Sequence, residues 1–398
     1  MSEWPIKTLG DVCSFENGDR GTNYPSRSAQ TSHGIPFINA GHLTDEGLDT
    51  ESLNFIPRER FDLLSNGKIR KGDILFCLRG SLGKFASVGT LSEGAIASSL
   101  VIVRPGESVL GAYLLAYFQS DLCADMINRF KNGAAQPNLS AQSLSKFRIP
   151  VPPFSDQQRI VDILGGAFEG IAIATANTKK NLQNARALFE NHLNSTFTRR
   201  GERWIVKRLG DISRINYGYT ESASVEKVGP KFLRITDIQY NRVDWIKVPY
   251  CRIDTTNYPK FKLEGGDIVF ARTGATTGKS YLVIDPPEAV FASYLIRVQV
   301  NTAEVLPEFL NLFFQTDPYW DNIRSGVSGS AQGGFNATKL RELLIPFAGS
   351  LKEQKSIVAK FDALAERTQR LASVYERKLA MLEALKRSLL HQAFAGQF

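Results

Sequence analysis

The sequence of 398 residues predicts an α+β fold in which two repeated mixed α/β domains are separated by two long helices. Three observations predict it. A Trp followed by Leu-Gly-Asp opens each half of the chain, a strand with a Gly-rich loop recurs in each half, and each half closes with a long stretch of helical periodicity. We expect the helices to pair as an antiparallel coiled coil, with a pseudo-two-fold axis relating the halves.

The opening segments establish the repeat. Residues 4–18, WPIKTLGDVCSFENG, match residues 204–218, WIVKRLGDISRINYG. The match continues in ASSLVIV at 97 and ASYLIRV at 292, and in FRIPVP at 147 and LLIPFA at 343. Because one duplicated unit covers nearly the whole chain, we expect domains at 1–150 and 201–348, a central helix at 151–200 and a C-terminal helix at 349–398.

A Gly-rich loop lies between two apolar strands in each domain. Residues 72–84 read GDILFCLRGSLGK, and residues 266–279 read GDIVFARTGATTGK. A phosphate-binding P-loop has four residues between its first glycine and the Gly-Lys pair and leads into a helix. Gly274 and Gly278 enclose only three residues, and an apolar strand pattern follows. The pattern excludes a P-loop and predicts strand, loop, strand, with a glycine hairpin that binds nothing as the alternative.

Each half closes with a helix introduced by proline, starting near DQQRIV at 156 and EQKSIV at 353. In the second helix the predicted seam steps by fours and threes, as in a coiled coil, with interruptions at a threonine and a lysine. Its residues are Ile357, Phe361, Leu364, Thr368, Leu371, Tyr375, Lys378, Leu382, Leu385 and Leu389. In the first helix, Gly165, Gly166 and Gly170 each cost about 1 kcal/mol of helix propensity. We expect these small residues to let the partner helix come close.

The composition favours a soluble globular protein with a polyanionic partner. Lys and Arg number 48 against 40 Asp and Glu, a formal net charge of +8, which suits nucleic acid. The start of the chain has no signal-peptide pattern, and no run resembles the roughly 18 apolar residues of a membrane span, so we expect a cytoplasmic location without a membrane partner. The four cysteines and four histidines show neither zinc-site spacing nor a disulfide framework.

Taken in this order and duplicated, these features resemble the specificity subunit of type I restriction-modification systems. The resemblance covers the whole chain and adds two further motifs, Gln-x-x-Ile-Val at 157–161 and at 354–358, and the C-terminal LLHQAFAGQF. It implies that each domain is a target-recognition domain that reads one half of a bipartite site on double-stranded DNA. It also implies that the paired helices set the spacer and dock two methyltransferase subunits, while motor-nuclease subunits join through the assembly.

The same resemblance implies a non-catalytic subunit without a cofactor, with S-adenosylmethionine, ATP and magnesium bound only by partner subunits. The residues agree with this. An amino-methyltransferase uses an Asn/Asp-Pro-Pro-aromatic turn to hold the flipped base. VPPF at 151 lacks the polar residue and DPPE at 285 lacks the aromatic one. We therefore expect the isolated chain neither to transfer methyl groups nor to hydrolyse ATP.

A DNA reader needs cations for phosphates and amide, hydroxyl or guanidinium groups for base edges. Three pairs of loops supply them: the loops after the opening strands, the Gly-rich loops, and the loops near 136 and 332. The candidate residues are Arg20, Asn23, Tyr24, Arg79, Ser81, Lys84, Gln136 and Asn138 in the first domain, and Tyr217, Tyr219, Thr220, Arg272, Thr276, Thr277, Lys279, Gln332 and Asn336 in the second. Taken singly, each is as easily a solvated turn residue.

The two sets differ in ways that suit different half-sites. Arg79 adjoins Gly80, whereas Thr273 separates Arg272 from Gly274. The lysines are expected to hold phosphates rather than read bases. An alternative function of another class remains open: a coiled-coil scaffold or decoy subunit that binds no DNA and sequesters methyltransferase subunits.

Overall fold

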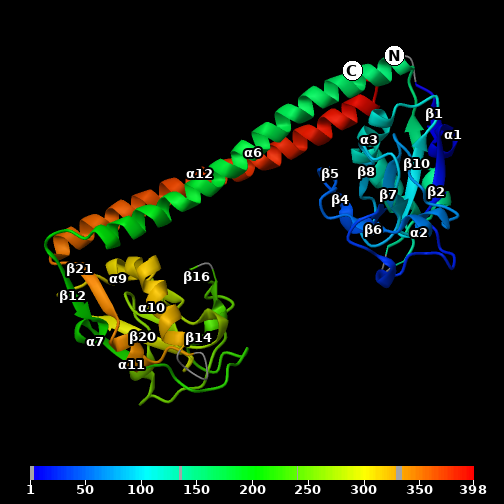
Figure 1. Ribbon diagram of the computed structural model, residues 1–398. Coiled ribbons are helices and arrows are strands. Elements are labelled where there is room, and N and C mark those ends of the chain that lie inside the picture. The colour runs from blue at the N-terminus through cyan, green and yellow to red at the C-terminus, as the bar shows by residue number, and fades with distance from the viewer. Residues whose placement is uncertain (1–3, 134–136, 240, 329–333) are drawn as a thin grey trace. The chain divides into compact units, whose positions relative to one another are not determined.

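A computed structural model of the protein describes residues 4–133, 137–239, 241–328 and 334–398. The chain forms two units (Figure 1). The first unit comprises Met1–Lys179 and Arg377–Phe398, and the second comprises Lys180–Glu376. Each of the two long helices, α6 (Phe154–Arg199) and α12 (Leu351–Phe394), therefore contributes one part to each unit.

The first unit is built on a four-stranded antiparallel sheet of order β2-β10-β7-β8. Its strands are β2 (Cys13–Asn17), β10 (Leu100–Pro105), β7 (Ile74–Cys77) and β8 (Phe85–Ser87). Successive residues of β7 and β10 face opposite cores, as the two-residue period of a strand requires. Phe76 and Val101 join one buried cluster, while Leu75 and Ile102 join the other.

Helices cover one face of this sheet and a second sheet lies on the other. On the helical face, α3 (Gly111–Gln119) and α4 (Asp121–Phe130) supply Tyr113, Tyr117 and Cys123 to the core. In the second sheet, β3 (Ile35–Ile38) pairs antiparallel with β6 (Asn54–Ile56) and parallel with β9 (Ala95–Ile96). The remaining elements are β1 (Ile6–Thr8) paired with β11 (Arg148–Pro150), β4 (Leu43–Thr44) paired with β5 (Gly47–Leu48), α1 (Leu9–Val12), α2 (Arg58–Asp62) and α5 (Ala141–Ser145).

The second unit repeats this plan, which confirms the predicted duplication. Its main sheet has the order β13-β20-β17-β18, and β14 pairs parallel with β19 as β3 does with β9. Where β6 pairs with β3, the described part of the second unit has isolated bridges, among them one between Lys231 and Tyr250. The strands are β12 (Trp204–Arg208), β13 (Ser213–Tyr217), β14 (Lys231–Leu233), β15 (Ile238–Gln239), β16 (Arg242–Val243), β17 (Ile268–Ala271), β18 (Ser280–Leu282), β19 (Ala289–Phe291), β20 (Leu295–Val300) and β21 (Leu344–Ala348). The helices are α7 (Leu209–Ile212), α8 (Tyr258–Phe261), α9 (Pro307–Phe313), α10 (Asp317–Ser328) and α11 (Ala337–Arg341).

The long helices run antiparallel where they pair within each unit (Figure 1). In the first unit, the Lys386 ammonium of α12 lies 5.1 Å from the centre of the Phe168 ring of α6. In the second unit, the rings of Phe189 and Phe361 meet edge to face at 5.7 Å. The early part of each helix thus pairs with the late part of the other, as the sequence predicts.

One glutamine fixes each domain to its closing helix. Gln157 is fully buried; its Oε1 accepts the Leu110 N–H at 2.8 Å, and its Nε2 donates to the Ser108 and Pro152 carbonyls at 3.0 and 2.9 Å. Gln354 repeats the pattern with the Leu306 N–H at 2.9 Å and the Glu304 and Ala348 carbonyls at 2.9 Å. This explains the glutamine of the repeated Gln-x-x-Ile-Val motif, because its amide combines one acceptor oxygen with two N–H donors, as these three bonds require.

The predicted coiled-coil seam of α12 is correct as far as Thr368. Beyond it, the half-buried Tyr375, Leu382 and Leu389 are also as predicted, whereas Leu371, Lys378 and Leu385 are not. Leu371 and Leu385 are 43% and 47% exposed, and Lys378 is exposed as well. The half-buried positions are instead Ala372, Leu379 and Lys386, each one residue later. A strict seven-residue repeat drifts by about 20° per heptad relative to a straight α-helix. At these three positions the contact with α6 therefore passes to the next residue along α12. Thr368 does not interrupt the seam, because its hydroxyl donates to the Leu364 and Ala365 carbonyls at 3.0 Å.

Two further expectations about α6 are corrected by the structure. A Cβ atom added at Gly165, Gly166 or Gly170 would meet no described atom within 4 Å, so these glycines do not admit α12. They lie on an exposed face of the helix. Among the described helices, α6 is also long and apolar enough to cross a membrane. Its most apolar stretch of 18 residues has a mean hydropathy of 1.3, and 11% of that stretch is buried. Helix length and composition alone support that statement, and Ile160 and Leu164 of α6 belong to the core of the first unit.

Candidate nucleic-acid interface

The two Gly-rich loops share one pattern of backbone hydrogen bonds, which we call the loop frame. In the first unit the Cys77 N–H donates to the Lys84 carbonyl at 2.7 Å, and the Gly83 N–H returns to the Cys77 carbonyl at 3.0 Å. In the second unit Ala271, Lys279 and Gly278 make the same two bonds at 2.8 and 2.9 Å. The strands on either side pair as hairpins, β7 with β8 and β17 with β18, which confirms the predicted strand, loop, strand.

The loop glycines are required by their geometry. Gly80 and Gly274 have φ angles of 79° and 76°, and Gly83 and Gly278 have 85° and 95°, a region that disfavours side chains. A Cβ at Gly278 would also lie 2.7 Å from the Ile323 side chain of α10. The second glycine of each loop thus lets a helix pack against it, and the loop shape itself is structural.

The shared frame shows that the two loop arginines are not equivalent. The Leu78 N–H bonds to the Ser99 carbonyl, and its own carbonyl accepts the Leu139 N–H. In the second unit, the Arg272 N–H donates to the Tyr294 carbonyl, and the Arg272 carbonyl accepts the Phe335 N–H. Arg272 therefore stands where the first unit has the buried Leu78, and the position of Arg79 is taken by Thr273. The second loop is one residue longer between its two glycines.

The Arg272 side chain lies against an aromatic ring. Its guanidinium carbon lies 5.1 Å from the centre of the Tyr217 ring, a cation–π distance. Its Nε is buried and has no hydrogen-bond partner within the described part of the chain. Tyr217 is fixed in turn, because its hydroxyl accepts the Ala337 N–H at 3.0 Å. The arrangement presents a pre-oriented guanidinium whose donors are not fully used.

The other Gly-rich-loop candidates have simpler settings. Arg79, Ser81 and Lys84 are exposed, and so is Lys279. Arg79 forms an isolated backbone bridge with Asn138, so the second and third loops of the first unit lie together. Thr276 and Thr277 are half-buried, and the Thr277 hydroxyl donates to the Gly274 carbonyl at 2.8 Å.

The loop after β2 contains one outward candidate and two anchored ones. Arg20 is exposed, and its Nη2 lies 3.4 Å from the Ser98 carbonyl. Asn23 donates through Nδ2 to the Leu63 carbonyl at 3.1 Å, and the Tyr24 ring packs edge-on against Phe37 at 5.9 Å. Asn23 and Tyr24 therefore have contacts that shape the loop.

In the second unit the loop after β13 has an aromatic character instead. Tyr219 is half-buried, and its ring lies 5.2 Å from that of Phe261. Partial burial, with help from the Glu221 and Asp254 carboxylates, raises the pKa of Tyr219, so its hydroxyl stays neutral. Thr220 is exposed beside it.

The third pair of loops is only partly visible. Gln136 and Gln332 lie outside the described residues. Asn138 is exposed, whereas the Asn336 side chain caps α11 by accepting the Lys339 N–H at 2.9 Å. Its counterpart is the cap of α5, Ser140, which accepts the Ser143 N–H at 2.9 Å. Pairing Asn336 with Asn138 is therefore wrong, because Asn336 occupies an N-cap, a position that favours Asn and Ser alike.

A fourth segment, which sequence reasoning missed, joins the loops in each unit. Ser99 and Tyr294 each accept the N–H of the residue that begins the Gly-rich loop, and the Ser293 N–H donates to the Tyr219 carbonyl at 2.8 Å. Ser98 is the partner of Arg20 in the first unit. Tyr294 is 60% exposed. The repeated ASSL and ASYL segments could have indicated this fourth segment, since the two copies differ there by a serine and an aromatic residue.

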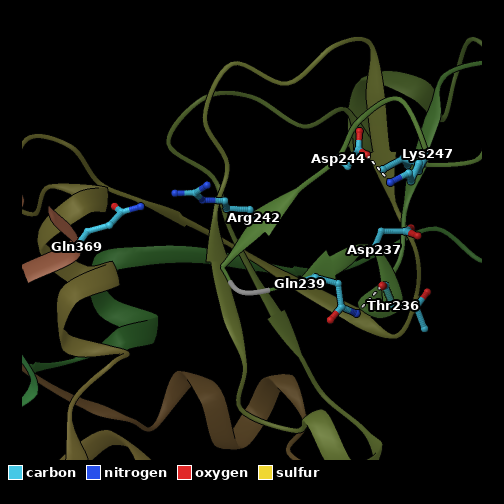
Figure 2. Close-up of a pocket in the computed structure, with 8 residues that line it drawn as sticks. Thr236, Asp237, Gln239, Arg242, Asp244, Lys247 and Gln369 are labelled. Atoms are coloured by element: carbon cyan, nitrogen blue, oxygen red, sulfur yellow. Dashed lines mark hydrogen bonds and ion pairs between the residues drawn. The ribbon is translucent and has the colours of Figure 1, made fainter. Parts of the chain in front are cut away.

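A polar cavity of about 740 Å³ lies elsewhere in the second unit (Figure 2). It is lined by Thr236, Asp237, Gln239, Arg242, Asp244, Lys247, Val248 and Gln369. Figure 2 shows the Arg242 and Gln369 side chains pointing toward one another, while Asp244 and Lys247 form an ion pair at 3.1 Å. No predicted site residue lines this cavity. Within the described ranges, no group of three or more His, Cys, Asp and Glu residues could hold a metal ion.

Comparison with known proteins gives the family. The chain matches the type I restriction modification DNA specificity domain over residues 1–184 and 201–375. The EcoKI specificity subunit of Escherichia coli is 22% identical over 91% of this chain and 82% of its own length. The MjaVIII specificity subunit of Methanocaldococcus jannaschii is 20% identical over 99% of this chain and 93% of its own length.

Solved structures agree on the fold. A chain from a study of complex assembly and conformational transition of the type I R-M system has a TM-score of 0.81 at 18% identity, covering 99% of this chain and 98% of that one. The HsdS subunit of Thermoanaerobacter tengcongensis has a TM-score of 0.62 at 18% identity, covering 100% and 98%. Since the family match spans both repeats, this chain belongs to the specificity subunits of type I restriction-modification systems, which recognise DNA and are not themselves catalytic.

Proposed function

We propose that this chain reads a bipartite DNA target, with one half-site for each unit and a spacer set by α6 and α12. The observation that carries the proposal is the shared loop frame. Two loops with the same backbone hydrogen bonds present Arg79 in one unit, where Leu78 is buried, and Arg272 and Thr273 in the other. A constant frame with different outward side chains is what two readers of different base sequences require.

The spacer part of the proposal rests on the junctions between domain and helix. Gln157 and Gln354 each make three hydrogen bonds that tie a domain to the start of its closing helix. Because these amides are fully buried, each domain is fixed in orientation on its helix. A fixed orientation is necessary if helix length is to set the distance between half-sites.

Exposed faces of the helices are the proposed docking sites for two methyltransferase subunits. On α6, Ile163 and Ile173 are 40% and 58% exposed, and Gly166 and Gly170 lie between them at helical spacing. Small residues flanked by exposed isoleucines would allow a partner helix to approach closely. Motor-nuclease subunits would join through the assembly. The partners would bring S-adenosylmethionine, ATP and magnesium, this chain would bind no cofactor, and the complex would work in the cytoplasm.

The test is to co-express the chain with the methyltransferase subunits of its system and sequence the methylated adenines of the host. We expect one bipartite motif, lost when this chain is omitted. The purified complex should bind that motif much more tightly than random DNA. A complex that assembles and binds no DNA would instead establish the decoy function, and methylation by the isolated chain would contradict both.

A further inference from the structure

The second unit has an apolar cavity beside its Gly-rich loop, at a place where the first unit has an arginine contact. The cavity measures about 340 Å³, and its lining includes Tyr219, Phe232, Ile235, Ala292 and Tyr294. One of its lining residues is bonded to the Gly-rich loop, since the Arg272 N–H donates to the Tyr294 carbonyl at 3.2 Å. In the first unit, Arg20 contacts the carbonyl of Ser98, the residue equivalent to Ser293.

Both charged residues that line this cavity have hydrogen-bond partners. Arg234 binds both carboxylate oxygens of Asp237, with Nε at 3.0 Å and Nη2 at 2.8 Å. Glu221 accepts the Ser222 N–H at 2.8 Å. An acidic side chain at the rim repels phosphate, so the cavity does not suit the DNA backbone. What it offers an incoming group is mainly aromatic and aliphatic surface.

Tyr294 is the exposed part of that surface. Tyr294 is 60% exposed, whereas the Tyr217 hydroxyl accepts the Ala337 N–H and the Tyr219 ring packs against Phe261. An exposed tyrosine at the edge of an apolar cavity offers an aromatic face to an incoming group. Its backbone is fixed by the Gly-rich loop, so the ring is presented from a rigid turn.

From this geometry we infer that Tyr294 and the cavity beside it receive the 5-methyl group of one thymine in the half-site read by the second unit. The methyl group of thymine projects into the major groove and is recognised by apolar contact. Arg272 would bond to a neighbouring base edge. The inference rests on the proposed function and adds Tyr294 as a specificity-determining residue.

The experiment uses the assembled complex and duplexes in which each thymine of that half-site is replaced in turn by deoxyuridine. This half-site is the one that changes when residues 203–345 are exchanged for those of a relative. At one thymine, loss of the methyl group should weaken binding by the wild-type complex about fourfold, the equivalent of one buried methyl group. Tyr294→Phe should keep that difference, because the ring and not the hydroxyl makes the contact.

Tyr294→Ser installs the residue type found at the equivalent position, Ser99. It should bind the thymine duplex about tenfold more weakly, with no remaining difference between thymine and deoxyuridine. Ile246→Ser, at a residue 90% exposed and outside the cavity, is the matched control and should change neither value. Because Tyr294 is exposed, its variants should keep the wild-type melting temperature.

Two results would overturn the inference while leaving the proposed function intact. One is a wild-type complex that is indifferent to every thymine methyl group of this half-site. The other is a Tyr294→Ser complex that still prefers thymine to deoxyuridine by the wild-type factor. A wild-type complex with no specific DNA binding at all would refute the proposed function, and the inference with it.

Discussion

The residue that begins the Gly-rich loop is Leu78 in the first unit and Arg272 in the second, although both make the same backbone bonds. Leu78 is buried in the core, whereas Arg272 rests on Tyr217 with its Nε unpaired among the described residues. The turn that supports the loop carries Ser99 in one unit and Tyr294 in the other. The difference teaches that the loop frame and the side chains on it vary independently.

The Gly-Asp turn before the loop also keeps its backbone position in both units while the ion pair around its aspartate differs. Asp73 receives two hydrogen bonds from Arg104 at 2.7 and 2.8 Å, and these bonds raise the pKa of Arg104. Asp267 lies 3.6 Å from Arg297, and the side chains of both are at most 6% exposed. Burial raises the pKa of Asp267 and lowers that of Arg297. The buried aspartate is common to both units, while its arginine partner sits at a different strand position in each.

The largest loss of stability is expected at the glutamine junctions between domain and helix, where the two units agree most closely. Gln157→Ala and Gln354→Ala each leave one buried carbonyl, one half-buried carbonyl and one half-buried N–H without their partner, which should cost on the order of 3 kcal/mol. Hydrogen–deuterium exchange should show faster exchange at the helix junction of the mutated unit only. Gln158→Ala, at an exposed neighbour, is the control and should cost less than about 0.5 kcal/mol. Equal loosening of both units by either variant would contradict independent junctions.

A smaller effect, on DNA recognition, is expected at the first residue of the Gly-rich loop, where the two units differ. Arg272→Leu gives the second unit the residue of the first, so the fold should survive, while recognition of one base pair should lose about 1 to 3 kcal/mol. The measurement is binding by the assembled complex to duplexes varied at each position of both half-sites. Specificity should relax at one position of one half-site. Equal weakening on cognate and random DNA would remove Arg272 from the base-reading residues.

The lysines should behave alike in the two units. Lys84→Ala and Lys279→Ala should each weaken binding to all sequences and reduce the salt dependence by about one phosphate contact, because both lysines are exposed at the same frame position. Titrations at several salt concentrations measure this directly. A change in sequence preference by either variant would show that the lysine reads a base.

Several features of the fold were predictable because they repeat or follow a strong period. The duplicated sheets, the strand, loop, strand at Gly80 and Gly274, and both long helices follow from such signals. Leu371, Lys378 and Leu385 of the seam were not predictable, because drift of the helix moves each contact to the next residue. At Leu371 and Ala372, hydrophobicity favours the residue that is exposed. At the candidate site, residue type suggested that Asn336 matches Asn138, whereas the structure places Asn336 at the N-cap of α11. Tyr294 was missed because its role depends on a contact with Arg272, distant in sequence.

A change in helix length should have the least effect on the half-sites. Four helix-forming residues inserted between Asn177 and Thr178, with four between Ser373 and Val374, lengthen both helices by about 6 Å and turn the seam by about 40°. This corresponds to one or two base pairs at about 3.4 Å each. Methylome sequencing should find a spacer longer by one or two base pairs between unchanged half-sites. An unaltered spacer would show that the helices do not set the distance.

The central claim is that each unit reads its own half-site. The most direct measurement replaces residues 203–345 with the matching region of another family member and sequences the methylated adenines of a host that carries the exchanged subunit with its partners. The account predicts a motif in which one half-site is that of the donor, while the other half-site and the spacer stay as before. Alteration of both half-sites by this single exchange would contradict it.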